Sequence, residues 1–497
     1  MLKRIMLIVF AVIFSCGFIW AQDFGFGFGF ADDNDDNEQD IGSFTAFAPV
    51  SSGFGSSLSV SIGGEVSAGI VGYFDEMSKA ASENDAQFIN TRDMFMFSGK
   101  LNFLANSSFA KGVINLKLIP ALVPVSIDEA YLSAFFGGFE ISAGLKKLAW
   151  GKADQPGPLD VINMPDASKI FVEMADSQSL MNVKLATPMI HASYRFGMFS
   201  KIEGVFLPSF EITSMAVSSL FSEAGPMLSL VSAPPSIRWI PPQMLDLLKS
   251  IQDEKLKFNK TETSGLDYAQ AGLRFTTSIV SADVGVQYFY GRMYQPAAKF
   301  HLPNIYPPSF EFLYNPYHQI GLDYAQVLFG FNVRAEFAAN ITEDIKGDDG
   351  HIYNPSLGWS FGFDRDIFTG FNVNFQANQS IRLLNDKVGS SKDPIISNLF
   401  PMPELNPNYD VEADKSITST RLTAMLSYKF LRDELELRAA VVWGIEDNDA
   451  AIMPSLIWVK DDFRAALSGG FFAGDSKGQL GQYKDNNFLK ISITYMF

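Results

Sequence analysis

Ten basic residues recur on the polar side of segments in which apolar and polar residues alternate. Successive side chains of a strand point to opposite faces, so all ten lie on faces that avoid the apolar residues. Ammonium and guanidinium groups along a hydrated wall would guide anionic solutes without making or breaking a bond. The ten bases are Lys100, Lys117, Lys146, Arg195, Arg274, Arg334, Arg421, Arg438, Arg464 and Lys490.

Six carboxylates fall on the same faces and leave them positive, although the whole chain carries a net charge of −17. The excess acid should therefore lie in the links between strands and near the N-terminus. In a second interpretation, opposite charges only neutralise one another along the wall. The net negative charge argues against a nucleic-acid partner. The six acids are Glu129, Glu140, Asp283, Glu336, Asp364 and Glu436.

Other residue types give weaker signs of chemistry. The four histidines, His191, His301, His318 and His351, are far apart and lack metal-ligand spacing. The acidic segment "NITEDIKGDDGH" lacks the spacing of a dedicated calcium loop. We therefore predict no metal, no cofactor and no catalytic residue. An outer-membrane hydrolase remains an alternative, because a Ser-His pair is set by geometry rather than by chain order.

The elements that must position these side chains follow from a period of two that begins near Leu58. In "GFNVNFQANQ", Phe371 and Phe375 share one face while Asn374 and Gln376 share the other. After residue 21 no apolar run approaches the roughly 20 residues of a membrane helix. The alternation predicts 18 strands, at 58–73, 92–105, 109–118, 126–136, 139–148, 188–197, 200–210, 265–275, 279–290, 313–325, 328–338, 355–364, 370–380, 416–429, 433–444, 451–460, 463–473 and 487–497.

The links between these strands are mostly long after odd-numbered strands and short after even-numbered ones. Outer-membrane barrels have long extracellular loops and tight periplasmic turns. The pattern therefore predicts an all-β, antiparallel, up-and-down transmembrane barrel of 18 strands with both ends on the periplasmic side. Sixteen strands are the alternative, because "DYAQVLFGF" contains no good turn residue.

The N-terminus reads as a signal peptide over residues 1–21. Lys3 and Arg4 precede a short apolar run, and a cleavage site follows Ala21. A lipoprotein anchored through Cys16, the only cysteine, is the alternative. Residues 22–57, which contain "DFGFGFGFADDNDDNEQD", are expected to form a disordered linker or a plug. The barrel then occupies residues 58–497.

Two segments resemble known families. The aromatic C-terminal end, with Tyr495 and Phe497, is similar to that of many bacterial outer-membrane proteins, where the barrel-assembly machinery reads it. The stretch 145–171 resembles large outer-membrane barrels of poorly described function that are related to alginate-export and other substrate-selective porins. There the resemblance implies an inward loop, although the usual Asn-Pro-x-Asp reads Asn163-Met164-Pro165-Asp166 here. The matching residues are Trp150, Gly151, Lys152, Asp154, Asp160, Val161, Ile162, Asn163 and Asp166.

Together these features predict a porin-like channel in the bacterial outer membrane for passive diffusion of small hydrophilic solutes, with a preference for anions. Its expected partners are outer-membrane lipid, the barrel-assembly machinery and the solutes, and an oligomer is possible. Two alternatives are a transporter of hydrophobic compounds gated by an N-terminal plug and a surface-binding protein that uses the barrel as an anchor. The sequence does not name the solute.

Overall fold

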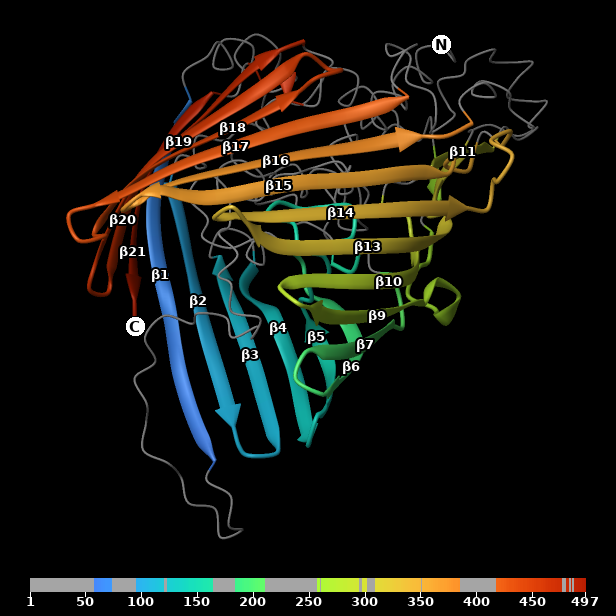
Figure 1. Cartoon of the computed structure of the whole chain (residues 1–497), viewed down its shortest axis with the longest axis horizontal. Helices are drawn as coiled ribbons and strands as arrows, with labels where there is room; N and C mark the ends of the chain where they lie inside the picture. The colour runs from blue at the N-terminus through green and yellow to red at the C-terminus, as the bar shows by residue number, and fades with distance from the viewer. Residues whose placement is uncertain are drawn as a thin grey trace.

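Eighteen antiparallel strands form one closed sheet, and Figure 1 shows the resulting barrel. The computed structural model describes residues 58–73, 95–119, 123–163, 184–210, 257–259, 261–294, 297–301, 309–349, 351–384, 417–475, 480–481, 484 and 487–497. The predicted signal peptide and the segment 22–57 lie outside these ranges. Each strand pairs with its neighbour along the chain, and β1 also pairs with β21, which closes the ring.

The barrel strands are β1 (Ser59–Tyr73), β2 (Phe95–Asn106), β3 (Ala110–Ile119), β4 (Val123–Phe136), β5 (Phe139–Lys146), β6 (Thr187–Phe196), β7 (Ser200–Leu207), β9 (Gln270–Ile279), β10 (Ala282–Arg292), β13 (Pro316–Leu328), β14 (Phe331–Thr342), β15 (Ser356–Phe368), β16 (Phe371–Arg382), β17 (Thr418–Phe430), β18 (Leu435–Gly444), β19 (Asp449–Lys460), β20 (Phe463–Gly474) and β21 (Phe488–Met496). A second, three-stranded sheet consists of β8 (Lys257–Asn259), β11 (Ala297–His301) and β12 (Ser309–Leu313). A short 3-10 helix, η6 (Leu266–Tyr268), precedes β9.

The predicted count of 18 barrel strands is confirmed, and the 16-strand alternative is wrong. The hairpin between β13 and β14 turns at Phe329 and Gly330, three residues later than the alternation suggested. Both residues have positive φ, at 55° and 80°. Two-residue hairpins favour this geometry, but Phe seldom adopts it, so its presence gave no turn signal. The predicted strand 265–275 is likewise shifted, because η6 occupies its first residues.

The last strand completes the ring of hydrogen bonds. Residues Phe488 to Met496 pair with Tyr73 to Glu65 of β1. Beyond them, the Gly64 and Phe497 main chains exchange two hydrogen bonds, at 2.9 and 3.0 Å between N and O. The final alternating segment is therefore an interior strand of a closed sheet, with no free edge along it.

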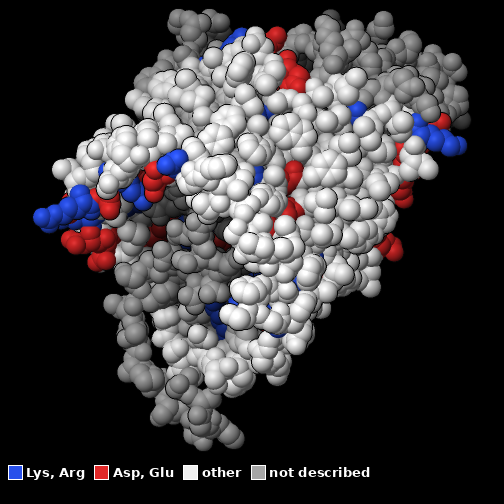
Figure 2. Space-filling model, viewed as in Figure 1, with Lys and Arg blue, Asp and Glu red and all other residues white. Residues whose placement is uncertain are grey.

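Apolar side chains cover the outside of the barrel. Along β13, for example, Ile320 and Leu322 are about half exposed, whereas Gln319 on the opposite face is buried. Figure 2 shows a largely uncharged surface, with charged residues gathered mainly toward the ends of the strands. No helix in the described ranges combines the length and hydropathy needed to cross a bilayer. A closed sheet with an apolar exterior and a polar interior is the form in which strands cross a membrane. The protein is therefore a multi-pass outer-membrane β-barrel.

Aromatic rings form a girdle at the end of the barrel that carries the short turns. Phe368 stacks on Phe371, with their centroids 4.8 Å apart. Tyr495 lies between Phe463 and Phe497, at 5.0 and 6.3 Å. Such girdles mark membrane–water interfaces in barrels of this kind. Phe497 is thus part of the girdle at the same height as the turns.

The aromatic side chain of Phe497 provides a test of barrel assembly. We expect Phe497→Asp to lower the amount of folded barrel in the outer membrane, because it places a charge in the aromatic girdle and alters the predicted assembly signal. Heat-modifiable mobility of the membrane fraction on a denaturing gel measures the folded amount. The matched control is Phe329→Asp, which makes the same change at an exposed turn tip. Equal yields of the two variants would contradict the role of Phe497.

Candidate functional site

The inward loop, residues 147–163, leaves the end of β5 and contacts the wall formed by β10 and β13 to β16. Around the eighteen-stranded ring, β16 is the eighth strand after β5. The strands between them are β6, β7, β9, β10, β13, β14 and β15. Strand β16 therefore lies nearly opposite β5. Hydrogen bonds between the loop and β16 connect residues more than 200 positions apart in the sequence. The loop therefore crosses the lumen rather than standing outside it.

The base of the loop is fixed by Asn163 and Lys147, both buried. The Asn163 side chain accepts a hydrogen bond from the Leu148 N–H at 2.7 Å and donates to the Lys146 and Leu185 carbonyls at 3.1 and 2.8 Å. The Lys147 ammonium lies 2.9 Å from the Asp128 carboxylate. Burial lowers the pKa of Lys147, and the Asp128 charge acts in the opposite direction. Asn163 thus holds both ends of the loop together.

The tip of the loop is bound by one carboxylate, Glu336 of β14. Its Oε1 accepts hydrogen bonds from the N–H groups of Lys152 and Ala153, at 2.6 and 2.8 Å. Its Oε2 lies 3.4 Å from the Leu159 nitrogen. A side chain at Gly151, whose φ is +102°, or at Gly157 would collide with this carboxylate. The two glycines therefore let the loop backbone close around Glu336.

A second carboxylate reaches from the loop to the wall. Asp154 Oδ2 lies 2.8 Å from both Arg334 Nη1 on β14 and Asn374 Nδ2 on β16. Arg334 also pairs with Asp364 on β15. The Asp160 carboxylate pairs with Lys184, which lies just before β6. The ion pair with Arg334 and the hydrogen bond from Asn374 connect the loop to β14 and β16, and the Asp160–Lys184 pair connects it to its own return segment.

Neutral amide side chains make most of the remaining loop contacts. We call this set the amide stripe, because it runs across the inner wall of four strands. Its members donate to the carbonyls of Gln155, Pro156, Pro158 and Leu159 at 2.9 to 3.3 Å. Gln287, Gln319 and Asn340 are also joined in a chain of amide hydrogen bonds. The stripe consists of Gln287, Gln319, Asn340, Asn374, Gln376 and Asn378.

The apolar side of the loop packs on the same wall. Trp150, Val161 and Ile162 are buried in one cluster with Phe289 of β10. A side chain at Gly272 would lie 2.8 Å from the Trp150 ring, and one at Gly358 would lie 2.8 Å from Pro158 Cβ. Small wall residues therefore make room for the loop. The predicted loop residue Asp166 lies outside the described residues.

The ten predicted lining bases all lie on the inner side of the alternation, but several have a carboxylate partner. The sequence identified the bases but missed five of the inward acids, Glu65, Asp128, Glu203, Asp323 and Asp449. Among these bases, Lys146 contacts a hydroxyl group, and its Nζ lies 3.0 Å from Ser142 Oγ. Arg195, Arg464 and Lys490 have the same inward alternation. The pairs are Lys100–Glu65, Lys117–Asp128, Arg274–Asp323, Arg334–Asp154, Arg421–Asp449 and Arg438–Glu436.

The paired charges differ in their access to solvent. The Lys100 and Glu65 side chains are 34% and 31% exposed, whereas Arg421 and Arg438 are 2% and 3% exposed. Lys152, on the loop, is 23% exposed and lies 3.8 Å from Asp283. Solvent therefore reaches Lys100 and Lys152, whereas Arg421 and Arg438 are almost fully enclosed.

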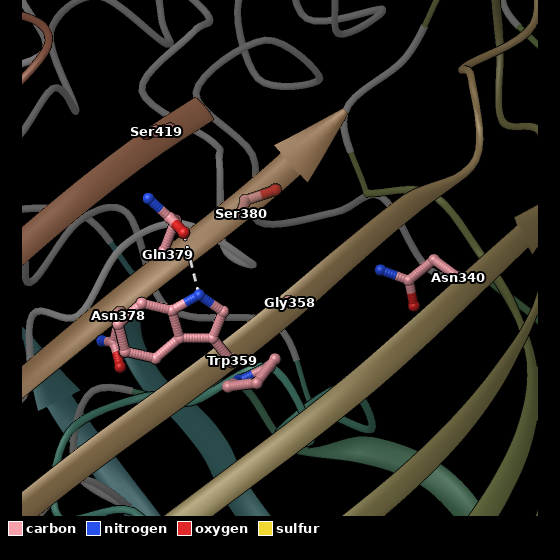
Figure 3. A pocket seen from close by; sticks show the side chains of 8 residues that line it. Asn340, Gly358, Trp359, Asn378, Gln379, Ser380 and Ser419 are labelled. Carbon is pink, nitrogen blue, oxygen red and sulfur yellow. Dashed lines mark hydrogen bonds between the residues drawn. The ribbon is translucent and has the colours of Figure 1, made fainter. Parts of the chain in front are cut away.

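A small pocket lies where Pro158 of the loop meets β14 to β17 (Figure 3). Its empty volume is about 360 Å³, including space open to solvent. Amide and hydroxyl side chains line it together with Trp359, whose Nε1 donates to Gln379 Oε1 at 2.9 Å. The lining residues are Pro158, Asn340, Gly358, Trp359, Asn378, Gln379, Ser380 and Ser419. The pocket carries no charged side chain.

The rings of His191 and His318 are bonded to neighbouring side chains. The His191 ring contacts Glu203 at 3.3 Å and Lys146 at 3.5 Å, while Ser142 Oγ donates to the His191 main chain instead. The His318 ring is bonded to Tyr288. Within the described ranges no group of His, Cys, Asp and Glu is placed to hold a metal ion. The side chains of the inward loop and its wall can position water and ions, through hydrogen bonds and paired charges.

Comparison with protein-family models and with curated protein sequences gives no match. Among solved structures, the chain is similar to OccK3 of Pseudomonas aeruginosa, with 9% identity and a TM-score of 0.46 over 88% of this chain and 95% of that one. OccK11 of the same organism gives 7% and 0.44 over 88% and 96%. A variant of the Rh. blastica porin gives 10% and 0.38 over 88% and 100%. The predicted relation to alginate-export porins stays a prediction.

Proposed function

We propose that the barrel is a passive channel for small hydrophilic solutes and that the inward loop sets its narrowest section. The observation that carries this proposal is the polar binding of the loop to the opposite wall. Barrels of 16 to 18 strands enclose an aqueous channel unless something fills it. A loop that spans the lumen and is held by Glu336 and the amide stripe reduces that channel while keeping its lining polar. Selection would then depend on size, charge and hydrogen bonds.

The polar character of the wall favours hydrophilic solutes over hydrophobic ones. Apart from the apolar cluster that contains Trp150 and Phe289, the inward residues near the loop are amides, hydroxyls and ion pairs, and amide and hydroxyl side chains also line the pocket beside Pro158. A hydrophobic solute would have to displace water from these groups without replacing its hydrogen bonds. A transporter of hydrophobic compounds would instead require an apolar path through the barrel.

A single-channel measurement tests the proposal. The purified chain, inserted in a planar bilayer in KCl, should give discrete conductance steps. Glu336→Gln should increase the open conductance or its fluctuations, because glutamine presents an NH2 group where Oε2 faces the Leu159 N–H. Loss of hydrogen bonds to a charged acceptor costs about 1.5–3 kcal/mol.

The matched control is Glu140→Gln, which removes an inward carboxylate at the turn end of β5. The control should retain the wild-type step size. Absence of conductance in the wild type would contradict the channel. Equal traces for the wild type and Glu336→Gln would leave the channel but remove the role of the loop.

We further propose a mild preference for anions, carried by the bases that solvent can reach. Lys100 and Lys152 each face a carboxylate, so their fields are partly cancelled and the preference should be small. In a KCl gradient, Lys100→Gln with Lys152→Gln should move the reversal potential toward cation selectivity. Lys460→Gln, at an exposed strand end, is the control. A cation-selective wild type, or an unchanged potential in the double variant, would exclude these bases as the cause.

A further inference from the structure

The outward face of the barrel changes character along β10 and β13 toward the end with the long links. On β10 the outward residues pass from Val286 through Tyr288 and Tyr290 to Arg292. On β13 they pass from Leu322 and Ile320 to His318. This gradient from aliphatic to aromatic and then to basic follows the passage from hydrocarbon to head groups. The basic end of the gradient therefore lies at the height of lipid head groups.

These residues form one contiguous set, which we call the outer aromatic patch: Tyr268, Tyr288, Tyr290, Arg292 and His318. The Arg292 guanidinium lies 4.8 Å from the Tyr268 ring centroid and 6.0 Å from that of Tyr290. The His318 ring lies 5.1 Å from the Tyr290 ring and accepts or donates a 2.7 Å hydrogen bond with the Tyr288 hydroxyl. Three separate elements, η6, β10 and β13, thus bring the patch together.

The charge of Arg292 is not compensated by a carboxylate among the described residues. Its guanidinium donates instead to two main-chain carbonyls, those of Tyr314 and Asp267. Each of its terminal nitrogens carries two N–H groups, so these bonds leave donors for a further acceptor. A guanidinium held in this way keeps an N–H donor on each terminal nitrogen for an oxyanion, and phosphate is an oxyanion that arginine binds well.

We propose that the outer aromatic patch binds the phosphate of a lipid head group at the end of the barrel that carries the long links. Arg292 would supply the charge-assisted hydrogen bonds, and Tyr268, Tyr290 and His318 would flank the head group. The adjacent aliphatic residues, such as Ile320, would contact the acyl chains. This site is independent of the channel, because every residue in it belongs to the outward face or to the rim.

Site-resolved photolabelling tests the proposal. The full chain is reconstituted in phosphatidylcholine vesicles with trace phosphatidylglycerol that bears a diazirine on its head group, and the labelled peptides are located by mass spectrometry. Labelling should concentrate at residues 266–268, 288–292 and 316–318. Arg292→Gln should lower it there about tenfold, as expected for loss of a charge-assisted hydrogen bond. A phosphatidylcholine probe should label these peptides less, because its phosphate is paired with its own cation.

Two further variants test whether the labelling depends on the outer aromatic patch. His318→Ala changes an exposed residue of the same patch and should lower labelling severalfold, whereas Arg432→Gln, in an exposed short turn, should leave it unchanged. Gel mobility without heating shows that each variant is folded. Unchanged labelling in Arg292→Gln, or equal labelling by both probes, would overturn the site. Suppression of labelling by excess inorganic phosphate would reject the lipid and assign the patch to soluble phosphate.

Discussion

The contact between Glu336 and the backbone of the inward loop is the interaction on which the lumen depends. A loop that crosses a water-filled barrel has backbone N–H and C=O groups on every side, and each needs a partner once the loop is buried against the wall. Glu336 accepts from the loop N–H groups, while the amide stripe donates to the loop carbonyls. Gly151 and Gly157 remove the side chains that would keep this carboxylate away. The polar side chains of the wall thus make the hydrogen bonds that water would otherwise make with the loop backbone.

The charges inside the barrel follow the same rule of local compensation. Arg274 pairs with Asp323, and Arg421 with Asp449, at sites where little solvent reaches them. An unpaired arginine buried in such a place would be strongly destabilising, so these pairs first serve the stability of the wall. The more exposed pairs, such as Lys100 with Glu65, are the ones that solvent reaches. The effective lining is therefore smaller and closer to neutral than the number of inward bases suggests.

The barrel itself could be predicted from the sequence because a period of two is a local signal that each strand repeats. All 18 barrel strands overlap their predicted ranges, and the main errors were the start of β9, where η6 precedes the strand, and the turn at Phe329, where an aromatic residue adopts a conformation that it seldom takes. The acids Glu65, Glu203 and Asp323 follow the same alternation and could have been found with it. Asp449 could not, because β19 begins two residues before its predicted range.

No local sequence pattern predicted which wall residues contact the inward loop. Alternation placed Asn374 and Gln376 on the inner face, and the resemblance suggested that Asp154 enters the lumen, but their contact depends on which strand lies opposite β5. That relation is set by strand number and register around the whole ring.

The path of the inward loop across the lumen can be measured directly by a disulfide between Pro158→Cys and Gly358→Cys. A Cβ at Gly358 would lie 2.8 Å from the Pro158 Cβ, so a shift of about 1 Å gives bonding geometry. Cys16 is the only native cysteine, and the signal-peptide prediction removes it. The account predicts that the oxidised double variant forms the crosslink almost completely, seen as a reducible mobility shift of the unfolded chain, while Pro158→Cys alone shows none. Two free thiols that both react with maleimide in the folded double variant would contradict it.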